Sequence, residues 1–222
     1  MAEQLTPRAL SDEYVDSLVA LDPVVATELG LPEGADRFGD LSPAGLAARA
    51  DLRATTLRRL DAIEKSPAEL AGDERRCARL LRERLEAEQA LAEAGDELRT
   101  LNILFSPVQQ ARLVFTMMPA GTDDDWAVIA RRVAAVPGML EGYVATLSEG
   151  RRRRLPVGPA QVDAVIAQLG QWLAADGGRG WYHHFVAAGP EALRHDLEAA
   201  AEAADTAIAD LRRWLADEYA PF

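Results

Sequence analysis

The stretch "MMPAGTDDDWAVIARRV", residues 117–133, places three consecutive aspartates directly before a tryptophan and an amphipathic helical pattern. Thr122 and Asp125 have the spacing of an N-terminal capping box, and the helix dipole favours carboxylates in a first turn. The alternative is a Mg²⁺ site formed by Asp123, Asp124 and Asp125, which would need carboxylates one turn apart, as in D-x-x-x-D. Consecutive side chains instead point about 100° apart around a helix. The stretch therefore predicts the start of a helix.

Several other segments begin in the same way, with a capping residue followed by a proline. Ser42 precedes Pro43, and Ser66 and Glu69 form an S-x-x-E capping box around Pro67. These signals, the spacing of apolar residues and the glycines that follow predict helices over about 11–21, 22–30, 42–65, 66–95, 122–133, 137–149, 159–177 and 190–219.

The sequence contains no run in which β-branched residues alternate with polar ones, as a half-buried strand would require. The predicted helices differ in length and share no fixed period, so a repeat array is not indicated. No long linker divides the chain. We therefore expect an all-α fold, an irregular multi-helix bundle of about 8–10 helices, in one domain that spans residues 1–222.

Residues 96–119, "DELRTLNILFSPVQQARLVFTMMP", form the least regular and most apolar segment. Its apolar side chains are too many to share one face of a helix. We therefore expect this segment to be the buried and best protected centre of the fold. In the alternative, its methionines line a site for a small apolar ligand or a partner helix, in a stand-alone helical binding protein.

The chain has 36 acidic and 24 basic residues, and its formal net charge is −12. Such a surface repels phosphate backbones and anionic lipids, so neither nucleic acid nor a membrane is an expected partner. The one basic run, 151–154, is expected in the last turn of a helix, with docking of an acidic partner as the alternative. No signal peptide or long apolar run is present, which predicts a cytoplasmic protein.

Cys77 is the single cysteine, so an internal disulfide is excluded and a reducing compartment fits best. Arg75, Arg76 and Arg79 surround it in sequence and could lower the pKa of its thiol. The alternative, which we favour, is that Cys77 packs as a small hydrophobic side chain.

The three histidines do not form a recognisable zinc motif. His183 and His184 are adjacent, so they point in different directions and supply one ligand to a site more readily than two. A site built from one of them with His195 and Asp196 is conceivable, but the sequence contains no H-E-x-x-H pair. We therefore expect no metal ligands in this chain.

The aromatic run around the histidine pair has a structural explanation. We expect Trp181, Tyr182, His183 and Phe185 to form an aromatic plug between helices, with the histidine edges satisfied by backbone groups. No G-x-S-x-G elbow, P-loop or dinucleotide fingerprint is present, so the sequence indicates no nucleophilic or nucleotide-dependent chemistry.

An isoprenoid enzyme would need a second metal-binding triplet besides the aspartates. Asn102, Ser106 and Gln110 have the spacing of N-x-x-x-S-x-x-x-E. This triplet precedes the aspartates, ends in a neutral amide and is interrupted by Pro107. A Mg²⁺-dependent isoprenoid enzyme therefore remains a remote alternative.

The order of the segments from about Tyr14 to Tyr219 resembles the N-terminal half of a widespread bacterial family of unknown function, whose members are inferred to be zinc metallopeptidases. The resemblance implies a mainly helical fold, similar in layout to helical carboxypeptidases and oligopeptidases. It rests on four elements: "DP-x-x-AT-x-LG" (22–30), the "SP" pairs at 42–43 and 106–107, "MP-x-x-T-x-x-DW" (118–126), and "VPGMLEGY" (136–143).

Members of that family carry an H-E-x-x-H zinc motif in a C-terminal half, and this chain ends at "WLADEYAPF" before any such segment. The resemblance therefore implies a non-catalytic helical lobe that forms one wall of a substrate cleft and is inactive alone, either in a fragment or in a short natural relative. Zinc would belong only to the missing C-terminal half. The partners would be that half, a peptide or small-molecule substrate, or a second copy in a homodimer. The candidate cleft residues are Arg112, Trp181, Tyr182, His183 and His184.

Overall fold

The computed structural model describes residues 5–66, 70–174 and 179–220, and every regular element in these ranges is helical. This confirms the predicted all-α multi-helix fold. None of the described helices is long and apolar enough to cross a membrane. The helices are α1 (Pro7–Leu21), α2 (Pro23–Glu28), α3 (Pro43–Glu64), α4 (Gly72–Glu93), α5 (Pro107–Leu113), α6 (Asp123–Ala134), α7 (Val136–Arg152), α8 (Pro159–Leu173), α9 (Trp181–Val186) and α10 (Arg194–Trp214), with the short turns η1 (Asp96–Arg99), η2 (Val114–Thr116), η3 (Glu191–Leu193) and η4 (Leu215–Tyr219).

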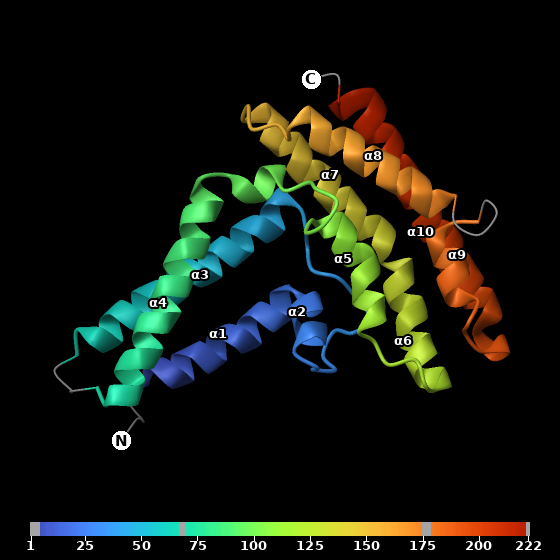
Figure 1. The fold of residues 1–222 in the computed structure, drawn as a ribbon. Helices are drawn as coiled ribbons and strands as arrows, with labels where there is room; N and C mark the ends of the chain where they lie inside the picture. Colours follow the sequence, from blue (N-terminus) through green and yellow to red (C-terminus); the bar gives the residue numbers. More distant parts are fainter. Residues whose placement is uncertain (1–4, 67–69, 175–178, 221–222) are drawn as a thin grey trace.

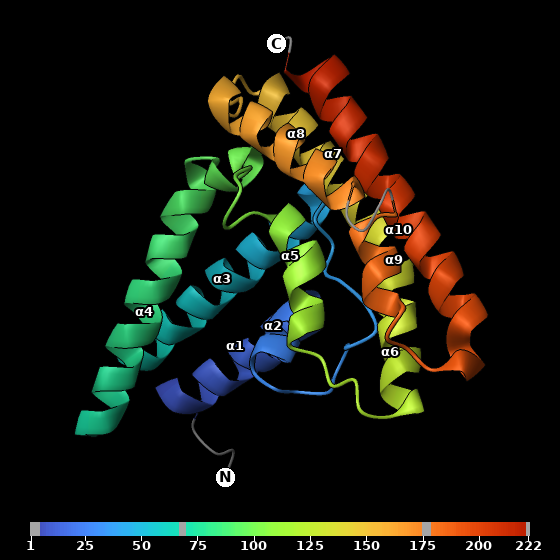
Figure 2. The ribbon, with the colours of Figure 1, turned by 45° about the vertical axis from the view of Figure 1, so that its right-hand side comes forward.

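The helices form two arms that meet at one end, with the outline of an inverted V (Figure 1). One arm consists of α1, α3 and α4, which pack against one another. The other arm contains α6 to α10, with α10 in contact with α6, α7, α8 and α9. Helix α5 lies between the two arms, and a view turned by 45° shows the same arrangement (Figure 2).

The capping signals in the sequence place several helix ends correctly. Ser42 is the N-cap of α3 and is followed by a proline, and the left-handed φ of Gly95 (+72°) follows the end of α4. The predicted start of the first helix near residue 11 is wrong, because α1 begins at Pro7 with Thr6 as its N-cap. The predicted start of the fourth helix near Ser66 is wrong, because α4 begins at Gly72 with Ala71 as its N-cap. The rest of the expected box, Pro67 and Glu69, lies outside the described residues, as does Gly177, the predicted end of α8.

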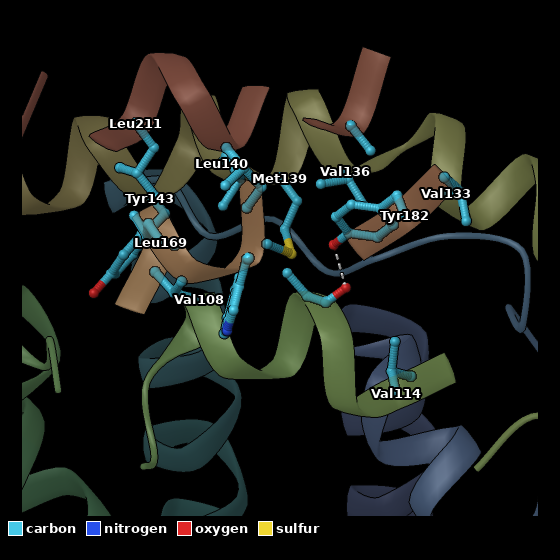
Figure 3. Close-up of a cluster of buried hydrophobic side chains, with 14 of the residues drawn as sticks. Val108, Val114, Val133, Val136, Met139, Leu140, Tyr143, Leu169, Tyr182 and Leu211 are labelled. Carbon is cyan, nitrogen blue, oxygen red and sulfur yellow. Dashed lines mark hydrogen bonds between the residues drawn. The ribbon is translucent and has the colours of Figure 1, made fainter. Parts of the chain in front are cut away.

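The buried hydrophobic side chains form two clusters. The larger one joins α2 and the helices from α5 to α10, and Figure 3 shows its centre around Met139, Leu140 and Tyr143. The smaller one lies within the arm of α1, α3 and α4, around Leu60 and Leu85. The single domain expected from the sequence stays a prediction, and the structure adds that its core has two centres.

The central apolar segment is only half buried, which corrects the expectation that it forms the protected centre. Leu101, Val108, Val114 and Phe115 are buried in the larger cluster. Other large side chains of the same segment are exposed, Phe105 by 84% and Leu104 by 63% of its surface. The reason is that a turn at residues 102–106 and the short helix α5 give the segment two faces, and neighbouring helices cover only one. The exposed large side chains of the segment lie in the turn before α5 (Ile103, Leu104 and Phe105), at the end of α5 (Leu113) and after η2 (Met117), and we call them together the exposed α5 side chains.

A fully buried arginine of α6, Arg132, joins that helix to α2. Arg132 donates from Nη1 to the hydroxyl of Thr27 at 2.8 Å and from Nη2 to the carbonyl of Pro23 at 3.3 Å. Its guanidinium also lies 5.2 Å from the ring centroid of Phe38. Burial lowers the pKa of Arg132 to about 10, so the side chain still carries its charge at neutral pH. The charge is therefore held inside the protein largely by neutral acceptors and a ring face.

Helix α7 fixes the chain where the two arms meet. The hydroxyl of Thr146 donates to the carbonyl of Leu41 at 2.6 Å, and the phenol of Tyr143 donates to the carbonyl of Thr100 at 2.6 Å. Gly150 allows an even closer approach, because a Cβ atom at this position would lie 2.2 Å from the carbonyl oxygen of Leu98. The contact between α7 and η1 therefore requires glycine.

We predict that Gly150→Ala destabilises the protein by about 1–3 kcal/mol, because the backbone of η1 must move away from α7. Gly138→Ala in the same helix is the matched control, since a Cβ atom there meets nothing within 4 Å. That variant should be neutral or stabilising by up to about 1 kcal/mol. Urea unfolding gives the free energy of unfolding of both variants. An equal change in the two would refute the close contact between Gly150 and η1.

Candidate functional site

Helix α9 carries the aromatic and histidine candidates, and its centre is tied to α5. Tyr182 is buried, and its hydroxyl donates to the carbonyl of Ala111 at 2.6 Å (Figure 3). Burial raises the pKa of this phenol, so Tyr182 stays neutral and serves as a hydrogen-bond donor. Trp181 stacks on Phe185, with ring centroids 5.1 Å apart, and both rings contact Phe115. The predicted aromatic plug between helices is thus present for Trp181, Tyr182 and Phe185, but His183 is not part of it.

Arg112 on α5 lies against two tryptophan rings, Trp181 of α9 and Trp172 of α8. The carbon centre of its guanidinium lies 4.6 Å from the ring centroid of Trp172 and 5.5 Å from that of Trp181. Within the part of the chain that the structure describes, Arg112 has no carboxylate partner. Two indole faces therefore orient this half-buried guanidinium while its N–H groups remain available to a ligand.

His183 lies on the opposite side of α9 from that arginine, beside α10. Its Nδ1 atom is 2.7 Å from a carboxylate oxygen of Asp205, and its Nε2 atom is 3.4 Å from Glu202. Asp205 also accepts the backbone N–H groups of Tyr182 and His183, each at 3.3 Å. The expectation that backbone groups satisfy the histidine edges is therefore wrong, because carboxylates from α10 do so.

The carboxylate of Asp205 fits against α9 only because residue 180 is glycine. A Cβ atom on Gly180 would lie 2.1 Å from the carboxyl carbon of Asp205. The side chain thus caps the first turn of α9 and holds the histidine at the same time. These groups line a pocket of about 510 Å³ that also includes Leu173, Arg179, Glu198 and Glu202.

The structure brings only some of the candidate cleft residues together. Arg112 and Trp181 are in contact, and Tyr182 is a buried link between helices rather than a surface group. His183 faces the α10 pocket, and His184 is exposed. Sequence reasoning missed Trp172 and Asp205, because the chain gives no local sign that α8 and α10 place them against Arg112 and His183.

These residues do not fit a zinc ion. His195 and Asp196 are exposed in the first turn of α10, and the pocket around His183 includes neither of them. In the described ranges, no group of three or more histidine, cysteine, aspartate or glutamate side chains is arranged to hold a metal. Asp205 is already bound to His183 and to two backbone N–H groups. The zinc that the family resemblance implies therefore has no ligand set among these residues.

The three aspartates form the predicted helix start. Thr122 Oγ1 accepts the N–H of Asp125 at 3.2 Å, and a carboxylate oxygen of Asp125 accepts the N–H groups of Thr122 and Gly121 at 2.9 and 3.0 Å. Asn102, from the second proposed triplet, accepts the N–H groups of Leu104 and Phe105 and so shapes the turn before α5. Both motifs thus have local structural roles.

The basic run and the cysteine also have structural roles. Arg151 donates to the carbonyl of Glu218 at 2.6 Å, and Arg152 and Arg153 pair with Glu149, which lowers the pKa of that carboxyl to about 2. The run follows the predicted placement at a helix end, since α7 extends to Arg152. Burial raises the pKa of Cys77, and Glu74 acts in the same direction, so the suggestion that arginines lower it is wrong.

We predict that Asp205→Ala destabilises the protein by about 1–3 kcal/mol, because it leaves His183 and two N–H groups of α9 without their acceptor. Glu202→Gln is the control, since this side chain is 76% exposed and its contact with His183 is longer, at 3.4 Å. Chemical unfolding should separate the two variants clearly. A loss below about 0.5 kcal/mol for Asp205→Ala, which is within the scatter of ordinary surface substitutions, would contradict the capping role.

The capping box gives a prediction with a defined pH dependence. Thr122→Ala should cost about 1 kcal/mol of stability at neutral pH. Hydrogen bonds to Thr122 lower the pKa of Asp125 in the folded state, so the contribution of its carboxylate is complete above the unfolded pKa of about 3.9 and is lost as the pH falls below that value. The stability difference between the wild type and Asp125→Asn, measured from pH 7 to pH 3, should therefore narrow at the acidic end. A stability difference that stays constant or grows toward pH 3 would refute the contribution of the Asp125 carboxylate.

Comparisons with known proteins show the family to which the chain belongs. A comparison with curated proteins gives no match. The model of one family, described as "Bacterial protein of unknown function (DUF885)", matches residues 23–222, which is nearly the whole chain and all of the larger core. The chain is therefore a member of the DUF885 family of bacterial proteins of unknown function.

Proposed function

We propose that this chain is the non-catalytic helical lobe of a metallopeptidase-like hydrolase, with α5 on the wall that faces a substrate cleft. The observation that carries this proposal is the set of exposed α5 side chains, Ile103, Leu104, Phe105, Leu113 and Met117. Large exposed sets of apolar residues mark sites of interaction in soluble proteins. Helix α5, which three of these residues precede, itself lies between the two helical arms (Figure 2).

The surroundings of α5 suit a peptide. Apolar side chains of a peptide can bury the exposed α5 side chains, at roughly 25 cal/mol for each Å² of apolar surface removed from water. Arg112, held by Trp172 and Trp181, offers planar N–H donors for a peptide carbonyl or carboxylate. In this role the lobe orients the peptide and excludes water, and no bond-breaking step falls to its own residues.

The second proposal is a stand-alone helical protein that binds a partner or a small ligand. The same exposed α5 side chains support it, because a partner helix could cover them as well as a peptide. A Mg²⁺-dependent isoprenoid enzyme has the least support, since Asp125 and Asn102 are engaged in the cap and the turn described above.

Photo-crosslinking tests the substrate wall directly. A leucine-rich peptide that carries a benzoylphenylalanine is irradiated with the purified chain, and adducts are located by peptide mapping. We expect adducts within residues 103–117, and we expect Leu104→Ser with Phe105→Ser to remove most of them. The matched control is Leu80→Ser with Leu91→Ser, which removes two exposed leucines from α4 and should leave the adducts unchanged.

The same peptide, kept in the dark, tests the non-catalytic part of the proposal. It should remain intact with the chain alone, with added Zn²⁺ and with a chelator. Hydrolysis that the chelator stops would contradict the proposal. Adducts that fall outside the α5 segment, or that both double variants reduce equally, would contradict both proposals, because both rest on the exposed α5 side chains.

A further inference from the structure

A separate groove runs between α7 and α10, away from α5. Its volume is about 550 Å³, within the range of small-ligand pockets. Figure 3 shows α5 and α10 on opposite sides of the core cluster, so this groove and the proposed substrate wall are distinct surfaces. We call it the α7–α10 groove and define it by Leu140, Glu141, Val144, Asp210, Leu211 and Trp214.

Helical periodicity builds the groove from two continuous faces. Leu140, Glu141 and Val144 are spaced so that they share one face of α7. Asp210, Leu211 and Trp214 share the facing side of α10, where smaller side chains such as Ala203 and Ala207 leave the space open. The floor is apolar, and the half-buried ring of Trp214 forms one end wall.

The charged groups of the groove are both carboxylates, one on each wall. Glu141 is exposed and, in the described parts of the chain, has no hydrogen bond or ion pair. Asp210 contacts Arg213 at 2.5 Å, but both side chains of this pair are more than half exposed, so the pair is weak and leaves the carboxylate accessible. The groove therefore combines an apolar floor with a negative rim.

We infer that the α7–α10 groove is a binding site for a small organic cation, an ammonium or guanidinium group attached to an apolar body. The cationic group lies between Glu141 and Asp210, and the indole face of Trp214 adds a cation–π contact. The apolar body covers Val144, Ala203 and Ala207, which line the groove and are accessible. The net charge of −12 of the chain attracts such a ligand and repels an anionic one.

Three probes of similar size separate charge from apolar burial: 4-phenylbutylamine, 4-phenylbutanol and 4-phenylbutanoate. Binding is followed by NMR through the indole N–H signal of Trp214, which Trp214→Phe identifies. We expect saturable binding of the amine with a Kd on the order of 1 mM or lower. The alcohol should bind about tenfold more weakly, and the carboxylate should not saturate the signal.

Charge removal on the groove walls provides the second arm of the test. Glu141→Gln and Asp210→Asn should each weaken amine binding by about threefold to tenfold. Glu198→Gln is the matched control, because it removes the same charge from α10 in the pocket around His183. It should leave the affinity unchanged, and urea unfolding confirms that all three variants remain folded.

Several results would overturn the inference. They are the absence of saturable amine binding, equal affinity for the amine and the alcohol, and an equal loss of affinity in Glu198→Gln. A dimer seen in sedimentation velocity that Ala207→Arg abolishes would also overturn it, because a second copy of the chain would then occupy the groove. None of these results bears on the α5 wall, so the two proposals can fail separately.

Discussion

The fold depends on how closely α10 can approach its neighbours. This helix contacts α6, α7, α8 and α9, and its buried side carries alanines between larger side chains at Leu197, Ile208 and Leu211. Ala200, Ala201 and Ala204 are buried on its inner side, so the backbones come near one another without a layer of large side chains between them. Larger residues at these positions would move α10 away from the neighbouring helices. An alanine-rich helix can therefore lie at the centre of the larger core.

This packing also explains where the candidate site lies. Because α10 approaches α9 closely, Asp205 can reach both the imidazole of His183 and the first turn of α9, provided that residue 180 is glycine. On the other face of α9, Tyr182 and the aromatic rings join α5 to the same core. The polar pocket and the Arg112–tryptophan cluster are thus two sides of one short helix, each fixed by a partner from a distant part of the sequence.

The sequence predicts the local part of this structure well and the long-range part poorly. Thr122 and Asp125 form the expected capping box because its geometry needs only neighbouring residues, and Ser42 with Pro43 starts α3 for the same reason. Residues 96–119 were expected in the core on composition, but burial depends on which helices cover each face. Periodicity does not give that information, nor does it place Trp172 beside Arg112 or Asp205 beside His183.

The bond from Thr146 to Leu41 and the close passage of Gly142, whose Cβ would come within 3.1 Å of the Ser42 nitrogen, have a mechanical consequence. The connection from α2 to α3 is an irregular stretch of chain, and such a connection would ordinarily act as a flexible joint. Here its last residues, Leu41 and Ser42, pack against α7, which restricts their movement. The start of α3, in one arm, is thus held in place by α7, in the other, because Leu41 and Ser42 lie against Thr146 and Gly142.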